Sequence, residues 1–299
     1  MTIVPAVTAP PDVWGSWVGD PLVASGLILA VWCHARGVAA IWRRAGAGRV
    51  VRRWQVWAWA CAMLALFVAL VSPLDAAAET LFSAHMAQHT LLTLVAGPLL
   101  AASAPVLPLL QGLPHRARQR VARWYGRAHD ARRLTSHRVW PFAVVGQYLA
   151  VMWLWHLPVA YEAALRSPAV HAVEHLTLIG ASVLLWWTVM VTGRRSLFGY
   201  GTGIAVVFLA GIAHGGLGAV LTFAPHVLYA RYGATAQAWG VDALHDQHLA
   251  GVIMWAPGKV VHGVAVVALA LAWLSSVEAR AQGRAPTISP GTEARRAPG

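Results

Sequence analysis

Histidines at helical spacing are the side chains of this sequence whose types and positions could do chemistry. Six of the fourteen histidines form three pairs whose members lie three or four residues apart: His85 with His89, His171 with His175, and His245 with His248. Residues at these spacings project from one face of a helix, so each pair could offer two imidazoles to one ion. Neutral imidazole binds copper, zinc and iron, and copper outcompetes most other divalent ions at nitrogen ligands.

The elements that must position these histidines are long apolar segments. Hydrophobic residues make up 58% of the 299 residues and charged residues only 11%, which is too few to cover a soluble globule of this size. A helix needs about 20 apolar residues to cross a bilayer. The stretches that meet this requirement are 21–42, 55–73, 84–110, 141–160, 170–192, 202–224 and 247–277. The sequence therefore predicts an all-α integral membrane bundle of seven transmembrane helices.

The arginines predict how this bundle is oriented. Of the 23 basic residues, 19 fall on one side of the seven-helix arrangement, and only Arg166 and Arg231 fall on the other. Cytoplasmic loops collect Lys and Arg, so we expect the N-terminus outside and the C-terminus in the cytoplasm. The net charge of +12 is then shared among loops rather than gathered on one folded face, which argues against nucleic-acid binding.

The same topology divides the chain into three regions. Residues 1–20 are expected to form an extracytoplasmic segment without the charged and apolar parts of a cleavable signal peptide, and residues 21–277 the transmembrane domain. The polar tail 278–299 is predicted to be disordered. The basic segment 112–139 could lie on the cytoplasmic leaflet as an amphipathic helix in contact with lipid.

Threading the chain through this topology brings seven histidines to one depth, within about two helical turns of the outer boundary. They are His85, His89, His156, His171, His175, His245 and His248. Two acids accompany them, Glu174 and Asp246, which could bind a metal directly or accept the second N–H of a ligating imidazole; we favour the second role. Taken one by one, His34, His214, His226 and His262 are expected to be packing or hydrogen-bonded side chains.

Four stretches resemble, in order, the successive motifs of a known family. They are "HMAQHTLLTLVAGPLL", "WLWHLPVAYEAALRSPAVHAVEHLTLIGASVLLWW", "LTFAPHVLYARYG" and "DQHLAGVIMW". These look like the motifs of the polytopic CtaG family, the assembly factors for caa(3)-type cytochrome c oxidase. The resemblance spans about 70–257. It implies a multi-pass protein of the bacterial cell (inner) membrane that assists the maturation of a haem-copper oxidase, with oxidase subunits as partners, and that is not an enzyme.

The resemblance also implies a role in copper supply and selects candidate residues. The histidine motifs of the family carry over to His85, His89, His156, His171 and His175, and its Asp-Gln motif to Asp246 and Gln247. The candidate metal site therefore consists of these five histidines and Asp246, with Glu174, His245 and His248 as weaker or indirect contributors. Copper is the expected ion.

Two other functions remain open from the sequence. Paired histidines on neighbouring membrane helices also make axial haem ligands, so a haem-binding redox protein similar to haem-a synthase is one alternative. The other is a scaffold that docks oxidase subunits and uses its histidines only structurally.

Overall fold

The computed structural model describes residues 12–283 apart from positions 16, 18, 19, 122, 124–138 and 193–197. Every regular element in these ranges is a helix. Most of the predicted N-terminal segment, of the basic segment 112–139 and of the C-terminal tail lies outside the described residues.

Within the described residues, five single helices are long and apolar enough to cross a membrane. They are α1 (Pro21–Ala45), α2 (Arg53–Leu70), α10 (Pro168–Met190), α11 (Tyr200–Phe223) and α13 (Ala243–Gln282). Large apolar side chains such as Leu22, Trp57 and Val264 are more than half exposed on these helices, as expected for surfaces that face lipid. Helix α13 runs on to Gln282, so residues 278–282, which we assigned to the tail, are helical.

Two further spans are bent pairs of helices. The first joins a helical stretch made of α4 (Phe82–Thr90), the π-helix η1 (Leu91–Ala96) and α5 (Gly97–Ser103) to α6 (Val106–Gly112) through a 70° bend. The second joins α8 (Trp140–Trp155) to α9 (Pro158–Arg166), also at 70°. If each pair is one span the total reaches seven, so length and composition allow five to seven spans.

Proline explains both bends, because its ring cannot donate a backbone hydrogen bond and restricts the residue before it. Ala104 takes a left-handed conformation with φ of 48° directly before Pro105. Leu157 is extended directly before Pro158, which then starts α9. The predicted spans 84–110 and 141–160 therefore contain a turn near one end rather than a straight helix.

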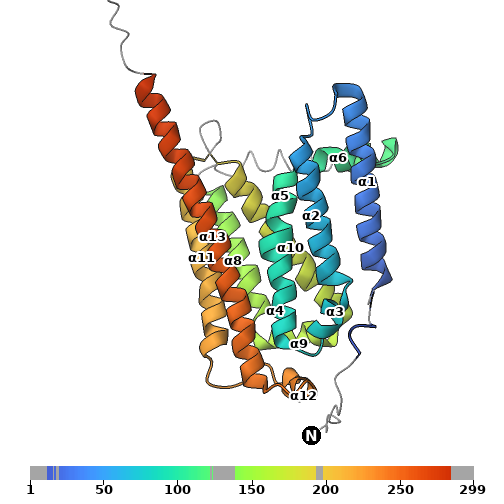
Figure 1. The fold of residues 1–299 in the computed structure, drawn as a ribbon, viewed down its shortest axis with the longest axis vertical. Coiled ribbons are helices and arrows are strands. Elements are labelled where there is room, and N and C mark those ends of the chain that lie inside the picture. Colours follow the sequence, from blue (N-terminus) through green and yellow to red (C-terminus); the bar gives the residue numbers. More distant parts are fainter. Residues whose placement is uncertain are drawn as a thin grey trace, which may run out of the picture.

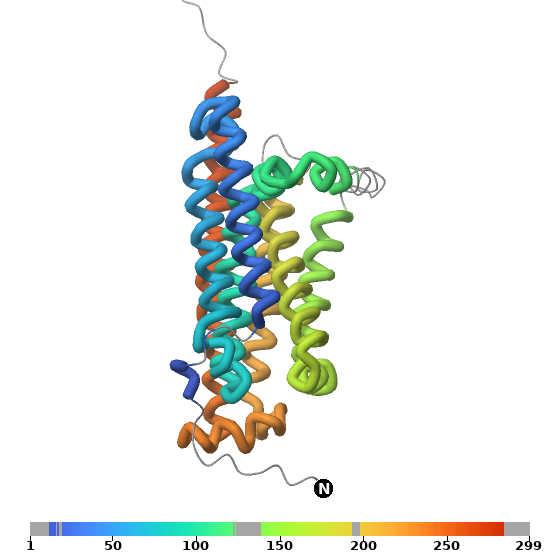
Figure 2. Tube along the Cα trace, turned by 90° about the vertical axis from the view of Figure 1, so that its right-hand side faces the viewer, coloured from blue at the N-terminus to red at the C-terminus, as the bar shows by residue number. Residues whose placement is uncertain are grey.

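The two ends of the bundle differ. The short helices α3 (Pro73–Ala78), α9 and α12 (Arg231–Ala238) gather at one end, here named the α12 end, whereas α6 lies at the other (Figure 1). Turned by 90°, the long helices stand side by side and α12 runs across their axes (Figure 2). Helices α4, α10 and α13 begin at the α12 end and α8 and α11 finish there, so residues far apart in the chain meet at this end.

Glycines bring α11 and α13 into close contact. A Cβ atom on Gly258 of α13 would lie 2.6 Å from Cδ2 of His214, and one on Gly251 would lie 2.5 Å from the backbone nitrogen of Thr222. A Cβ on Gly211 of α11 would in turn lie 3.0 Å from the Cβ of His262. Small residues at such positions let membrane helices approach closely, which makes this pair a rigid wall of the bundle.

The π-helix η1 ties α4 to α10. The backbone N–H of Gly97 bonds to the carbonyl of Leu92, five residues earlier, instead of to that of Thr93. The Thr93 carbonyl accepts a hydrogen bond from the Ser182 hydroxyl of α10 at 2.5 Å. A side chain on Gly97 would collide with that hydroxyl, at 1.9 Å. Single π-helical turns are common near functional sites, and this one lies immediately after His89.

Candidate metal centre

Three elements carry the buried histidines at the α12 end. His85 and His89 lie on α4, His156 is the residue that follows α8, and His171 and His175 lie on the first turns of α10. Their rings contact one another: the ring centroids are 5.5 Å apart for His85 and His171, 5.4 Å for His89 and His175, and 5.8 Å for His89 and His156. The structure therefore brings all five histidines of the family motifs into one group, named the histidine cluster.

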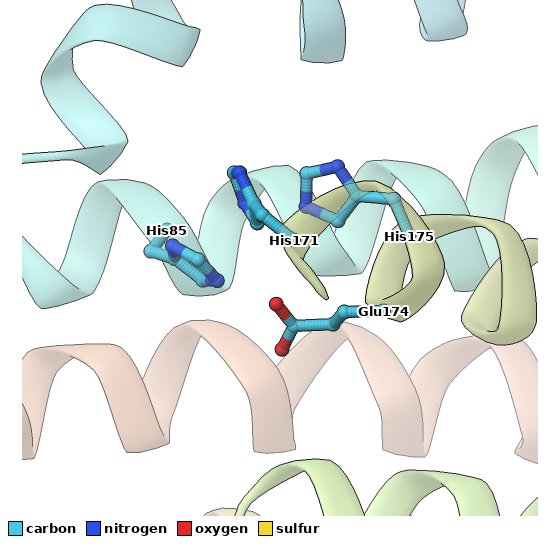
Figure 3. A group of neighbouring side chains, drawn as sticks. All are labelled: His85, His171, Glu174 and His175. Carbon is cyan, nitrogen blue, oxygen red and sulfur yellow. The ribbon is translucent and has the colours of Figure 1, made fainter. Parts of the chain in front are cut away.

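The tightest part of this cluster includes a carboxylate. One ligand atom from each of His85, His171, Glu174 and His175 lies within 4.8 Å of the others. Figure 3 shows three of these side chains projecting from α10 toward His85 on α4. Glu174 and His85 are almost completely buried, with exposed fractions of 0% and 1%. Imidazole and carboxylate are ligand types that transition-metal ions bind in proteins, and a four-coordinate ion takes four ligands. Three imidazoles and one carboxylate therefore suit such an ion in both type and number.

For neutral imidazoles, the hydrogen bonds of His156 and His85 indicate which ring nitrogen carries the proton. His156 Nδ1 lies 2.7 Å from the Met152 carbonyl, which can only accept, so Nδ1 carries the proton and Nε2 is bare. The Tyr232 hydroxyl donates to the Ala78 carbonyl at 3.0 Å and accepts from His85 Nδ1 at 3.4 Å, so His85 Nε2 is bare as well. His89 Nε2 then donates to His85 Nε2, 2.9 Å away.

Several atoms of the cluster that could bind a metal are buried and have no hydrogen-bond partner among the described residues. They are Nδ1 of His89, Nε2 of His156, His171 and His175, and both carboxylate oxygens of Glu174. His89 Nε2 lies 3.6 Å from Oε1 of Glu174. Buried polar atoms are nearly always hydrogen-bonded, and an isolated buried carboxylate is costly, so these unpartnered atoms make the cluster a candidate cation site.

A layer of aromatic residues closes the cluster toward the α12 end. Tyr161 of α9 hydrogen-bonds to the Tyr232 hydroxyl at 3.1 Å, and the hydroxyl of Tyr229 donates to the His156 carbonyl at 2.7 Å. Phe82 packs against all three tyrosines. Burial raises the pKa of Tyr232 above its usual range, so this hydroxyl keeps the proton that it donates. We did not single out these tyrosines from the sequence, although all three lie within the motif stretches.

Asp246 and Gln247 hold the framework of the histidine cluster, and neither belongs to the group whose ligand atoms converge. The buried Asp246 carboxylate accepts from the backbone N–H groups of Phe82, at 2.7 Å, and Ser83, at 3.2 Å. It thereby caps the first turn of α4 from α13. Gln247 accepts from the N–H of Leu228 at 2.7 Å and donates to the His226 carbonyl at 3.1 Å, which fixes the loop before α12.

The last histidine pair lies apart from the cluster. His248 Nε2 is 3.0 Å from the Ala224 carbonyl, and His245 is exposed. Neither belongs to the group whose ligand atoms converge.

A second polar contact orients α4 from the side of α2 and α3. Gln88 donates to the Ala69 carbonyl and to Oδ1 of Asp75, each at 2.7 Å. Burial raises the pKa of Asp75 to about 6, the Gln88 hydrogen bond opposes this rise, and the neighbouring Glu79 adds to it. The helix that carries His85 and His89 is therefore held at three points: by Asp246 at its start, by Gln88 along its side and by Ser182 at η1.

The fold and the site together define a class, a multi-pass helical membrane protein with a buried histidine and carboxylate group near one end of the bundle. The family model described as "Cytochrome c oxidase caa3 assembly factor (Caa3_CtaG)" matches residues 32–276, and the chain belongs to this family. The match is wider than the span of about 70–257 that the motifs indicate.

Two curated relatives are similar to this chain. They are the uncharacterised protein Mb0105 of Mycobacterium bovis and the uncharacterised protein MT0111 of Mycobacterium tuberculosis. Each is 27% identical over 270 residues, an alignment that covers 86% of this chain and 39% of the relative. The chain thus spans about two fifths of the length of these relatives. No solved structure matches.

Proposed function

We propose that this protein binds a copper ion in the histidine cluster and assists its delivery to, or insertion into, cytochrome c oxidase during assembly of that enzyme. One observation carries the proposal. Four imidazole nitrogens and both oxygens of Glu174, all atoms that could bind a metal, are buried in the cluster without hydrogen-bond partners among the described residues. A cation in their midst would satisfy lone pairs that otherwise have none. Membership of the oxidase assembly family supports copper as that cation.

The ligand chemistry favours a transition metal over calcium or magnesium, whose ligands are oxygens. Imidazole suits copper, zinc and iron, and copper binds most strongly to nitrogen sites. His85, His171, His175 and Glu174 form the first candidate set. An ion bound there would replace the hydrogen bond that His85 Nε2 accepts from His89 Nε2. His89 and His156 lie beside it with free nitrogens, so an ion could exchange one imidazole for another as it moves. Such an exchange makes and breaks only coordination bonds, which fits a non-enzymatic role.

We infer further that the cluster lies at the outer side of a bacterial cell membrane and that subunits of the oxidase are the partners; the distribution of Lys and Arg supports the first point, and membership of the oxidase assembly family supports the second. To deliver copper to a centre on that side, the protein must be able to release the bound ion. A cluster with more nitrogens than one ion requires allows stepwise ligand replacement, because no intermediate has to leave the ion without ligands.

Metal analysis and visible absorption spectroscopy on one purified sample test the proposal. We expect about one copper ion per chain after loading and washing, and loss of that copper in the double variant His85→Ala and His89→Ala. His262→Gln is the matched control, because His262 is a buried histidine outside the cluster. Equal copper in the native protein and the double variant would show that the metal assignment is wrong.

The same sample separates the two rival functions. A Soret band with near-stoichiometric haem would favour a haem-binding redox protein. Oxidase assembly that persists after removal of all five cluster histidines would favour a scaffold without metal.

A further inference from the structure

A pocket leads from the surface of the α12 end to the histidine cluster. Its volume is about 170 Å³, which is room for a small hydrated ion. Glu79 and Arg231 line its exposed side, Ala164 and Leu165 of α9 line a wall, and His85 and His171 lie at its inner side. These residues come from α9, α10, α12, α4 and the turn after α3, so the pocket opens among the short helices and not between two long helices toward lipid.

Exposure falls along the pocket. Glu79 and Arg231 are exposed, His171 is partly buried, and His85 is only 1% exposed. Among the described residues, His171 Nε2 has no hydrogen-bond partner. An unpartnered imidazole nitrogen therefore lies between the exposed charges of Glu79 and Arg231 and the buried ligand atoms.

The two charges at the opening have opposite signs. Among the described residues, neither Glu79 nor Arg231 forms an ion pair. A carboxylate at the opening raises the local concentration of cations, and a guanidinium lowers it. The field of Glu79 already reaches a neighbouring group, because Glu79 contributes to the raised pKa of Asp75.

We propose that this pocket is the port through which copper enters and leaves the cluster, with Glu79 attracting the ion and His171 as the first imidazole to bind it. The inference rests on the proposed function and adds the route to it. From His171 the ion passes to His85, Glu174 and His175, whose ligand atoms lie within 4.8 Å of one another and of that of His171. The aromatic layer of Phe82, Tyr161 and Tyr232 covers the cluster beside the port.

A cysteine placed in the pocket wall tests the route after the protein has folded. In a background with Cys33→Ala and Cys61→Ala, the variant Leu165→Cys is purified and then treated with a bulky, water-soluble methanethiosulfonate reagent. Copper uptake, and copper release to a soluble chelator, are followed in the same sample before and after treatment. The control is Val159→Cys, on the same helix but 85% exposed and outside the pocket.

We expect the modified Leu165→Cys protein to take up and release copper at least about tenfold more slowly, equivalent to a barrier raised by about 1.4 kcal/mol. The control should keep its rates after treatment. Unchanged rates in modified Leu165→Cys, with full copper loading, would overturn the port and leave the copper site standing. A native protein that binds no copper would overturn both.

Variants of the two charges at the opening give a second test, in which the rate of copper uptake changes in opposite directions. Misfolding would not produce opposite changes. At low salt, Glu79→Gln should slow uptake about two- to threefold and Arg231→Gln should speed it by a similar factor, with both differences vanishing at high salt. The amount of copper bound at equilibrium should stay the same. Shifts of the same sign in both variants would contradict the proposed route.

Discussion

Buried histidines occur in two regions of the molecule, the histidine cluster at the α12 end and a pair farther along α11 and α13. In the pair, the Tyr148 hydroxyl lies 3.3 Å from His214 Nδ1, and His214 Nε2 lies 3.1 Å from the Met254 carbonyl. Both nitrogens of His214 are therefore occupied by protein groups. In the cluster, by contrast, one nitrogen on each of four rings and both oxygens of the Glu174 carboxylate have no hydrogen-bond partner among the described residues.

The packing around His214 and His262 is another difference from the histidine cluster. The ring of His214 fits against Gly258, and His262 fits against Gly211, so each ring fills a space left by a glycine on the opposite helix. His262 Nδ1 bonds to the carbonyl of Gly258 at 2.8 Å, and one nitrogen of that ring, Nε2, stays without a partner. Burial alone therefore does not distinguish a candidate metal ligand from a packed histidine; the grouping of several unpartnered nitrogens around one carboxylate does.

The largest expected effect compares one histidine from each region. His175→Ala removes a ligand atom of the tightest group, so we expect copper affinity to fall at least about 100-fold, or about 2.7 kcal/mol. His214→Ala removes only a packed, hydrogen-bonded ring and should lower thermal stability while affinity stays within about threefold of native. Competition titration with a copper chelator measures the affinities. A similar loss of affinity in both variants would remove the distinction between the two regions.

The next effect concerns the buried carboxylate. Glu174→Gln keeps the side-chain volume and removes the charge, so copper affinity should fall about 10- to 100-fold. The metal-free variant should unfold at the same temperature as the native protein or at a higher one, because a buried carboxylate without donors no longer has to be accommodated.

The matched control for this carboxylate is Glu162→Gln, which breaks the exposed ion pair with Arg166 and should change unfolding and affinity little. Chelator competition and thermal unfolding in detergent give both quantities. A metal-free Glu174→Gln protein that is much less stable than native would mean that the carboxylate has a structural partner instead of a metal.

The sequence predicts which histidines belong to each of the two regions. Helical spacing and topology pointed to His85, His89, His171 and His175 because period and depth depend only on local sequence and hydropathy. His214 and His262 were predicted to be packing residues, and their glycine contacts agree with that reading.

The sequence could not predict what depends on tertiary contact. The Asp246 carboxylate meets the N-terminus of α4 across 164 residues of chain, and the hydroxyl of Tyr232 meets the Ala78 carbonyl across 154. The sequence leaves open whether Glu174 binds a metal directly or orients a ligand, and favours the second role. Tertiary packing of α4 against α10 brings the Glu174 carboxylate within 4.8 Å of the ligand atoms of three histidines, which makes direct binding geometrically possible. The bends before Pro105 and Pro158 follow from residue type, but their angle of 70° is set by packing.

A smaller effect should come from the glycines of the α11–α13 wall. Gly258→Ala would place a methyl group 2.6 Å from His214 Cδ2, so the ring must shift, at a cost of about 1–3 kcal/mol in unfolding free energy. Copper stoichiometry below the unfolding temperature should not change. Gly263→Ala is the control, since nothing lies within 4 Å of its added Cβ, and helix propensity alone should leave it neutral or slightly stabilised. Loss of copper in folded Gly258→Ala would show that the two regions are coupled.

The smallest effect on unfolding free energy is expected for Asp246→Asn; Asp246 links the two regions because it lies on α13 and caps α4. Asp246→Asn keeps one acceptor oxygen but loses the charge next to the positive end of the α4 dipole, at a cost of about 1 kcal/mol. His85 lies in the first turns of that helix, so copper affinity should fall less than about tenfold, well short of the loss in His175→Ala. Asp246→Ala, which removes both acceptors, should cost more stability than Asp246→Asn and lower affinity in proportion. If Asp246→Asn instead abolishes copper binding at unchanged stability, the carboxylate is itself a ligand, and the framework role assigned to α13 is wrong.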